Sequence, residues 1–220
     1  MDAYPFPHAV IEDAFPLELI RAATQEWPDD SWQHWVRYDN AIENKRTCCD
    51  LSKVGPACKE LMLRVQNLPE MSELVSDPDW YAAGMHDMGI GGYLGTHLDA
   101  DRHPKTGHAR AWNAILFLCE GWKQEWGGAL QLWPPALDKP AVEIFPGTQL
   151  VLFKPGDLAY HSVSKLTCPP EVRRRTLACF WWEPTTAPGI RPRARFVRTA
   201  QEAHDPEVDA LRVRRATFSM

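Results

Sequence analysis

The feature that most constrains the fold is a series of short apolar runs from about residue 81 onward, each broken by glycine, proline or charged residues. The clearest runs are residues 93–99, 112–119, 129–133, 142–145, 149–153 and 176–182. Short runs separated by turn residues are typical of the strands of a sandwich or barrel. We therefore expect a mainly β architecture over this part of the chain.

Helices are expected at the flanks of this segment. Pro16 begins one helix and Pro28 ends it, and apolar residues at near-helical spacing predict a second over 56–67. Shorter strands are expected over 6–12 and 32–38, and a last short helix over 207–215. The two N-terminal helices are expected to brace one face of the sheet. The fold class predicted is mainly β with flanking helices.

Composition excludes several classes of protein. The formal net charge of −5 argues against coating nucleic acid by bulk electrostatics. Six cysteines without a CxxC pair predict reduced thiols rather than a disulfide framework or a cysteine-based zinc site. The first residues do not form a signal segment and no apolar run approaches 18 residues, so we expect a cytoplasmic protein without a membrane partner.

The strongest chemical signal is the tripeptide His97-Leu98-Asp99, followed further along the chain by His161. Residues two apart in a strand point the same way, so His97 and Asp99 can grip one ion from a single strand. Two histidines and one carboxylate are the set that holds non-haem Fe(II) on one face. A surface strand pair and a half-buried histidine are the competing interpretations. A structural zinc site fits less well, because three ligands with an open face suit catalysis.

The segment from about residue 84 to 183 resembles the Fe(II)- and 2-oxoglutarate-dependent oxygenases, in particular the prolyl-hydroxylase-like branch. The matching pieces are the HxD motif, the strand after the polar loop, and the segments WGGALQLW, LVLFKPGDLAYHSV and RRTLACFWW, in that order. The N-terminal YPFPHAVIEDAFP is also similar to the entry strand of such proteins.

The resemblance implies a double-stranded β-helix, or jelly-roll, with the metal at its open end. It implies that His97, Asp99 and His161 bind Fe(II) and that 2-oxoglutarate and O2 are co-substrates, with ascorbate as a supporting reductant. The length of the chain and the order of its segments predict one oxygenase domain over 1–220, with N-terminal support over 1–80, a catalytic core over 81–185 and a basic extension over 186–220.

The closing strand implied by the resemblance puts Arg174 at the position that binds the far carboxylate of 2-oxoglutarate, with Thr176 on the same strand face. Asn113 and Phe117 correspond to positions that line the co-substrate pocket. Some relatives carry a tyrosine hydroxyl where this chain has Phe117, so Asn113 or Thr176 must share the carboxylate.

Two questions stay open: which arginine binds the far carboxylate, and which reaction the protein catalyses. A slip of one residue would give the carboxylate to Arg173 or Arg175 instead of Arg174. Relatives that halogenate replace the metal-binding carboxylate with a small residue, so the presence of Asp99 favours hydroxylation of a C–H bond.

The primary substrate is unknown, with a peptidyl or free amino acid such as proline preferred. The mixed-charge loop 101–110 suits a polar substrate. The tail from residue 187 carries seven arginines and four acids, or +3, which leaves −8 for the rest. The basic tail therefore keeps open the alternative of an oxygenase that acts on a nucleotide or nucleic acid, although nucleic acid is the less favoured partner.

The remaining alternative is a metal-binding jelly-roll module without turnover. The six other histidines, His86 among them, are interpreted as uninvolved, with His103 and His108 worth attention in a loop expected to overhang the metal.

Overall fold

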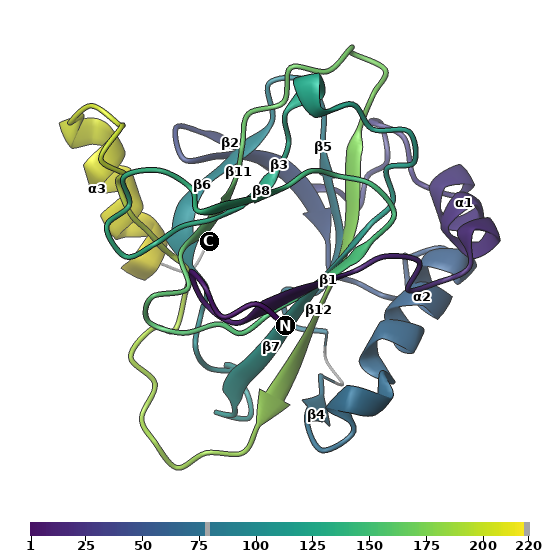
Figure 1. The fold of residues 1–220 in the computed structure, drawn as a ribbon, viewed down its shortest axis with the longest axis horizontal. Coiled ribbons are helices and arrows are strands. Elements are labelled where there is room, and N and C mark those ends of the chain that lie inside the picture. The colour runs from purple at the N-terminus through teal and green to yellow at the C-terminus, as the bar shows by residue number, and fades with distance from the viewer. Residues whose placement is uncertain (78–79, 218–220) are drawn as a thin grey trace.

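The computed structural model describes residues 1–77 and 80–217, and its strands curl around a central space with the helices on the outside (Figure 1). The helices are α1 (Leu17–Gln25), α2 (Pro56–Gln66) and α3 (Pro206–Thr217), with short 3-10 turns at Pro69–Met71 and Gln124–Trp126. The strands are β1 (His8–Ile11), β2 (Val36–Asn40), β3 (Glu43–Cys48), β4 (Val75–Ser76), β5 (Gly84–Met88), β6 (Tyr93–Leu98), β7 (Ala109–Phe117), β8 (Leu130–Leu132), β9 (Val142–Ile144), β10 (Leu150–Phe153), β11 (His161–Val163), β12 (Arg174–Glu183) and β13 (Arg195–Phe196). The predicted mainly β fold with flanking helices is confirmed.

All strand pairs in the described residues are antiparallel and form one continuous sheet. Its order is β1-β10-β7-β12-β5-β3-β6-β11-β8-β9, with β2 on β3, β4 on β12 and β13 on β6. The sheet bends where β3 pairs with both β5 and β6, so the long half faces the shorter half β6-β11-β8-β9 across the central space. A sheet that folds back on itself in this way leaves an enclosed inner face for a site.

Both ends of the chain contribute strands to this sheet. β1 pairs with β10, β3 lies between β5 and β6, and β13 pairs with β6. The division of the chain at residues 81 and 186 remains a prediction, but strands from all three of its segments pair with one another.

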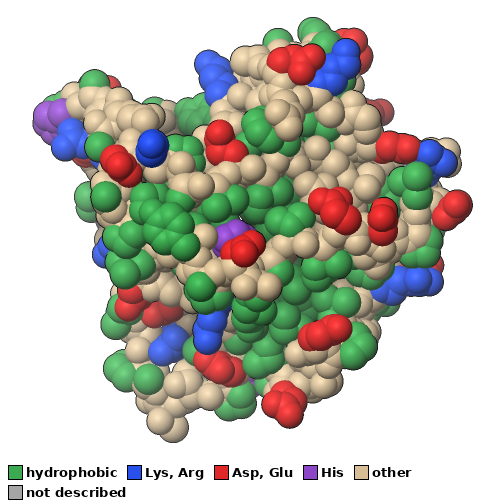
Figure 2. All heavy atoms as spheres, viewed as in Figure 1, with side chains coloured by type: hydrophobic (Ala, Val, Ile, Leu, Met, Phe, Trp, Pro, Cys, Tyr) green, Lys and Arg blue, Asp and Glu red, His purple; other side chains and the backbone are tan. Residues whose placement is uncertain are grey.

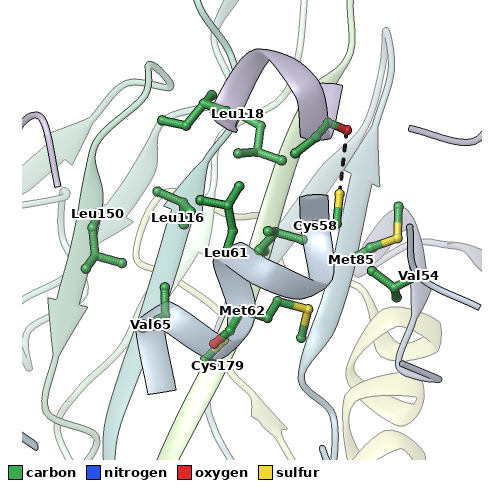
Figure 3. Packing of buried hydrophobic residues seen from close by; sticks show 14 of the residues in the cluster. Val54, Cys58, Leu61, Met62, Val65, Met85, Leu116, Leu118, Leu150 and Cys179 are labelled. Carbon is green, nitrogen blue, oxygen red and sulfur yellow. Dashed lines mark hydrogen bonds between the residues drawn. The ribbon is translucent and has the colours of Figure 1, made fainter. Parts of the chain in front are cut away.

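The outer face of the long half is closed by α1 and α2, as predicted. α2 buries Cys58, Leu61, Met62 and Val65, which pack toward β7, β10 and β12 (Figure 3). The Cys58 thiol also donates a hydrogen bond to a carbonyl of α1, at 3.5 Å. Fully burying a side chain of this size contributes about 1.5–3 kcal/mol. These contacts hold the sheet from the outside and leave its inner face available for a site.

The structure differs from the sequence prediction most clearly at β2, β3 and β5. The strand expected over 32–38 is shorter and later, at β2, because Trp32 and Trp35 pack edge to face at 5.2 Å in a turn. β3 and β5 were not predicted. Their inward-facing residues include Lys45, Thr47 and His86, so the apolar alternation that marks a strand is absent there.

The surface in Figure 2 mixes acidic and basic side chains, and neither sign dominates this face. None of the helices in the described residues combines the length and the apolar character that crossing a membrane would require.

Candidate metal and co-substrate site

His97, Asp99 and His161 converge on one point of the inner face. β6 supplies His97, Asp99 follows the end of that strand, and β11 supplies His161 directly opposite His97 in the register. One ligand atom from each of the three lies within 4.8 Å of the others. Nε2 of His97 is 3.5 Å from Asp99 Oδ1, and Nε2 of His161 is 3.6 Å from Asp99 Oδ2. Two imidazoles and a carboxylate at this spacing fit a divalent metal of the Fe(II) type.

Both histidine rings are oriented for metal binding through Nε2. Nδ1 of His97 lies 2.9 Å from the carbonyl of Gly95, and Nδ1 of His161 lies 3.0 Å from the carbonyl of Ala159. A carbonyl accepts the hydrogen on Nδ1, which leaves the Nε2 lone pair free for a metal. Burial, and then the neighbouring His97, lower the pKa of His161 to about 4, so its ring is neutral near pH 7.

Asp99 is held by two further side chains. Asn113 donates a hydrogen bond to Oδ2 at 2.6 Å, and Nη1 of Arg110 lies 3.4 Å from the same oxygen. Burial alone would raise the pKa of Asp99, but its interactions with His161, Arg110 and His97 outweigh this effect and hold the pKa well below its usual range. The carboxylate is therefore ionised, as a metal ligand must be.

A cavity of about 500 Å³ joins this cluster to Arg174. Arg174 is 2% exposed, donates from Nε to the carbonyl of Gly128 at 2.7 Å, and lies over the Phe117 ring at 4.9 Å. Its Nη2 has no hydrogen-bond partner within residues 1–77 and 80–217. Burial lowers the pKa of Arg174 to about 10. A buried guanidinium with an unused N–H group fits a ligand carboxylate in the cavity.

The two neighbouring arginines point the other way. Arg173 pairs with the buried Asp87 behind the sheet, and Arg175 reaches the carbonyl of Thr24 at the end of α1. Neither lines the cavity. The strand register therefore turns only Arg174 of the three toward the metal cluster.

The other residues expected at the co-substrate are also near the cavity. Asn113 and Thr176 line it, whereas Phe117 lies under the guanidinium of Arg174. Thr176 is opposite Phe117 in the register, so both belong to the wall that carries Arg174.

Several cavity residues were not found from the sequence. They are Lys45 and His86 on β3 and β5, Arg110 on β7, and Arg193, Phe196 and Arg215 from the tail. The tail side chains reach the cavity because β13 pairs with β6 and Arg215 of α3 bonds Glu43 at 2.9 Å. The sequence offers one signal for these residues, an alternation of polar side chains along β3. Without knowledge that β3 pairs with other strands, such a polar segment is interpreted as a loop.

The loop histidines do not reach the cavity. His103 is buried against Asp77, with 3.4 Å between Nε2 and Oδ1, and packs on the Trp182 ring. His108 is also absent from the cavity wall. The structure therefore places neither histidine in the cavity wall, and the ring of His103 is turned toward Asp77.

The chain is similar to known oxygenases by two comparisons. Residues 83–183 match the family model of the 2OG-Fe(II) oxygenase superfamily. This stretch contains the whole candidate metal cluster and Arg174. No curated protein matches the sequence.

Solved structures share the fold at low sequence identity. A prolyl-4-hydroxylase from Pseudomonas putida is 18% identical with a TM-score of 0.60, over 84% of this chain and 96% of that one. A prolyl hydroxylase from Trichoplax adhaerens, solved with a hypoxia inducible factor peptide, is 16% identical with a TM-score of 0.54, over 80% and 83%. HygX from Streptomyces hygroscopicus, with nickel and 2-oxoglutarate bound, is 15% identical with a TM-score of 0.50, over 82% and 84%. The predicted double-stranded β-helix is confirmed by this shared fold.

Proposed function

Because the chain belongs to the 2OG-Fe(II) oxygenase superfamily through residues 83–183, we propose that it is a non-haem dioxygenase that hydroxylates a C–H bond of an amino acid, peptidyl or free, such as proline. In that reaction 2-oxoglutarate and O2 give succinate and CO2. One oxygen atom enters succinate and the other enters the substrate hydroxyl.

The proposal gives each cavity residue a task. His97, Asp99 and His161 hold Fe(II), which supplies the activation of oxygen when it is bound. Asn113 fixes the orientation of the Asp99 carboxylate through its 2.6 Å hydrogen bond. Arg174 binds the far carboxylate of 2-oxoglutarate.

The observation that carries the proposal is Arg174 itself. A metal-binding module without turnover has no need for a guanidinium buried in the wall of the same cavity. Burying its charge away from water is costly without an anionic partner. Among the described residues only the hydrogen bond to the Gly128 carbonyl and the contact with the Phe117 ring offset that cost. A dicarboxylate that chelates the metal at one end supplies the missing partner at the other.

The preference for an amino-acid substrate comes from two sources. The similar structures include prolyl hydroxylases, one of them solved with a peptide. The cavity wall also mixes aromatic side chains, such as Tyr81 and Phe180, with charged groups, which suits a substrate with both apolar and polar parts.

The test is succinate formation by the purified protein with Fe(II), 2-oxoglutarate and ascorbate, first alone and then with proline and proline-containing peptides. We expect wild-type turnover that disappears in His97→Ala and in Arg174→Met and persists in Arg175→Met, the matched control on the outer face. Succinate without any hydroxylated proline would retain the oxygenase and exclude this substrate.

Binding without turnover would favour the sensing module instead. If wild-type protein binds Fe(II) and 2-oxoglutarate under anaerobic conditions but forms no succinate in air, the hydroxylase proposal is wrong. Loss of turnover in Arg175→Met rather than Arg174→Met would place the co-substrate on the other face of β12.

A further inference from the structure

The wall of the cavity carries more positive charge than the metal and the co-substrate account for. Five cationic side chains and two carboxylates line it, an excess of three positive charges in a chain whose net charge is −5. The cations are Lys45, Arg110, Arg174, Arg193 and Arg215, and the carboxylates are Glu43 and Asp99. Because the charges of Fe(II) and of the 2-oxoglutarate dianion cancel, their binding leaves this excess unchanged. The excess favours an anion as the remaining ligand of the cavity.

Arg110 is the cation that lies beside the metal cluster without a hydrogen bond to hold it. The residue is 8% exposed, and its Nε is buried and has no hydrogen-bond partner within residues 1–77 and 80–217. Its ion pair with Asp99, at 3.4 Å from Nη1 to Oδ2, is longer than a charge-assisted hydrogen bond. Asp99 already accepts a hydrogen bond from Asn113 at 2.6 Å and is a ligand of the proposed metal. The guanidinium therefore has N–H groups to offer to another anion.

Two aromatic rings orient this guanidinium. Cζ of Arg110 lies 3.9 Å from the centre of the Phe180 ring and 5.0 Å from the centre of the Trp182 ring. Rings that cover the face of a guanidinium leave the N–H groups at its edge available to a ligand. Arg110 and Phe180 both line the cavity. Arg110 is thus an oriented donor in the cavity wall and not a solvated surface charge.

Arg110 and Arg174 lie on opposite sides of the metal cluster along β7. Phe117, which lies under Arg174, is four residues further along this strand than Asn113. Arg110 is three residues before Asn113, whose side chain bonds Asp99. At about 3.3 Å per residue these separations are about 13 Å and 10 Å along the strand. A 2-oxoglutarate that joins the metal to Arg174 therefore extends away from Arg110, and the space beside Arg110 is left for the primary substrate.

We propose that the primary substrate is a free amino acid and that Arg110 binds its carboxylate, on the side of the metal away from Arg174. Two N–H groups of the guanidinium donate to the two carboxylate oxygens, the paired geometry that suits arginine. A residue inside a peptide has no backbone carboxylate, so the cavity selects the free form of the two that the proposed function leaves open. Lys45, Arg193 and Arg215, outside the stretch 83–183 that matches the family, attract the same anion. This inference rests on the proposed function, because it names the substrate class of the same site.

The test compares acids with their amides in anaerobic calorimetry on the protein loaded with Mn(II) and 2-oxoglutarate. The probes are the common free amino acids and the matching amino-acid amides, which retain the side chain and the amine and lack the carboxylate. We expect at least one acid to bind and its amide to bind about 10- to 100-fold more weakly, because a charge-assisted hydrogen bond is lost. In air with Fe(II), the same acid should be hydroxylated and should accelerate succinate formation.

Variants of Arg110 then assign the carboxylate. Arg110→Met should weaken the acid about 10- to 100-fold and leave the amide unchanged, so that the preference for the acid disappears. A role confined to supporting Asp99 would instead lower the affinity for Mn(II) and weaken acid and amide alike. Arg110→Lys, which retains the charge, should recover part of the preference. Arg195→Met is the matched control, because Arg195 is exposed on β13 and does not line the cavity.

The outcomes separate the failure of this proposal from that of the proposed function. Equal binding of acids and amides, hydroxylation of a peptide blocked at its C-terminus, or binding of no acid to protein that still binds 2-oxoglutarate would each overturn the free amino acid as substrate. A preference for the acid that survives in Arg110→Met would overturn the assignment to Arg110, and Arg110→Lys decides this point if the methionine variant does not fold. Wild-type protein that binds no 2-oxoglutarate overturns the proposed function itself.

Discussion

Replacing Arg174 with methionine should weaken the binding of 2-oxoglutarate and leave the stability of the fold almost unchanged, because this side chain contributes little to the ligand-free fold. A pKa lowered from 12.5 to about 10 means that burial disfavours the charged form of Arg174 by about 3 kcal/mol, at 1.36 kcal/mol per pH unit. Against this stand one charge-assisted hydrogen bond to Gly128, about 1.5–3 kcal/mol, and the contact with the Phe117 ring, about 1 kcal/mol. The two sides nearly cancel.

We therefore expect Arg174→Met to change the free energy of unfolding by less than about 1 kcal/mol. An arginine in a buried ion pair would cost about 3–5 kcal/mol when removed, because its partner charge would be left behind. The affinity for 2-oxoglutarate should fall far more, by about 2–5 kcal/mol, or roughly 30-fold to several thousand-fold, because the far carboxylate loses its charged partner.

Urea unfolding and anaerobic calorimetry with 2-oxoglutarate measure the two quantities on the same preparations. Arg175→Met is the matched control, because Arg175 leaves the same strand toward α1 and should retain full affinity. A loss of stability above 3 kcal/mol in Arg174→Met would refute the argument from uncompensated burial. Unchanged affinity would refute the assignment of the carboxylate to Arg174.

Three further predictions concern the metal, the wall of the cavity and the ligands. Asn113→Leu removes the hydrogen bond to Asp99 and should lower the affinity for Mn(II) about 10- to 100-fold, measured in a titration that follows free Mn(II). Unchanged affinity would show that Asp99 does not need this hydrogen bond to bind the metal. Glu43→Gln should cost about 1–3 kcal/mol at pH 7, because the buried carboxylate pairs with Lys45 and Arg215, which remain partly hydrated. Burial alone would raise the pKa of Glu43, but Lys45 and Arg215 outweigh it and lower the pKa, so this stability is present above about pH 4.5 and is lost in more acid solution. Unfolding curves of wild type and Glu43→Gln should converge at low pH, and a gap that persists there would contradict the ionic origin. Mn(II) with 2-oxoglutarate at 100 times its Kd should stabilise wild type by about 2.7 kcal/mol, or roughly 5–11 °C in Tm, and a scan in which 2-oxoglutarate adds nothing to Mn(II) would count against co-substrate binding.

The geometry of the metal cluster was predictable because its first half is local. Residues two apart in a strand share a face, so His97 and Asp99 had to lie together once the segment was a strand. The same rule turned Arg174 and Thr176 to one side of β12 and Arg173 and Arg175 to the other. Which side faced the metal came from the family resemblance, and the structure turns Arg174 toward the cavity.

The local pattern was weaker where a strand carries polar residues inward. β3 and β5 present Lys45, Thr47 and His86 to the cavity, so neither shows the apolar alternation from which strands are predicted. The sequence therefore carries no signal for the position of His86. A lone histidine in a segment without a recognised strand has no defined face, and its neighbours were not known.

The sequence by itself determined the β-rich core, the two bracing helices and the placement of His97 beside Asp99, because these depend on hydrophobic period, helix-start and helix-stop residues, and spacing within one strand. Only the tertiary structure decided that β3 joins β5 to β6, that β13 and α3 bring tail arginines to the cavity, and that His86 lies in one row with Thr176. These features depend on strand pairing and packing between residues distant in the chain. Pairing of that kind is set by the burial and hydrogen bonding of the whole sheet, and no short stretch of sequence specifies it.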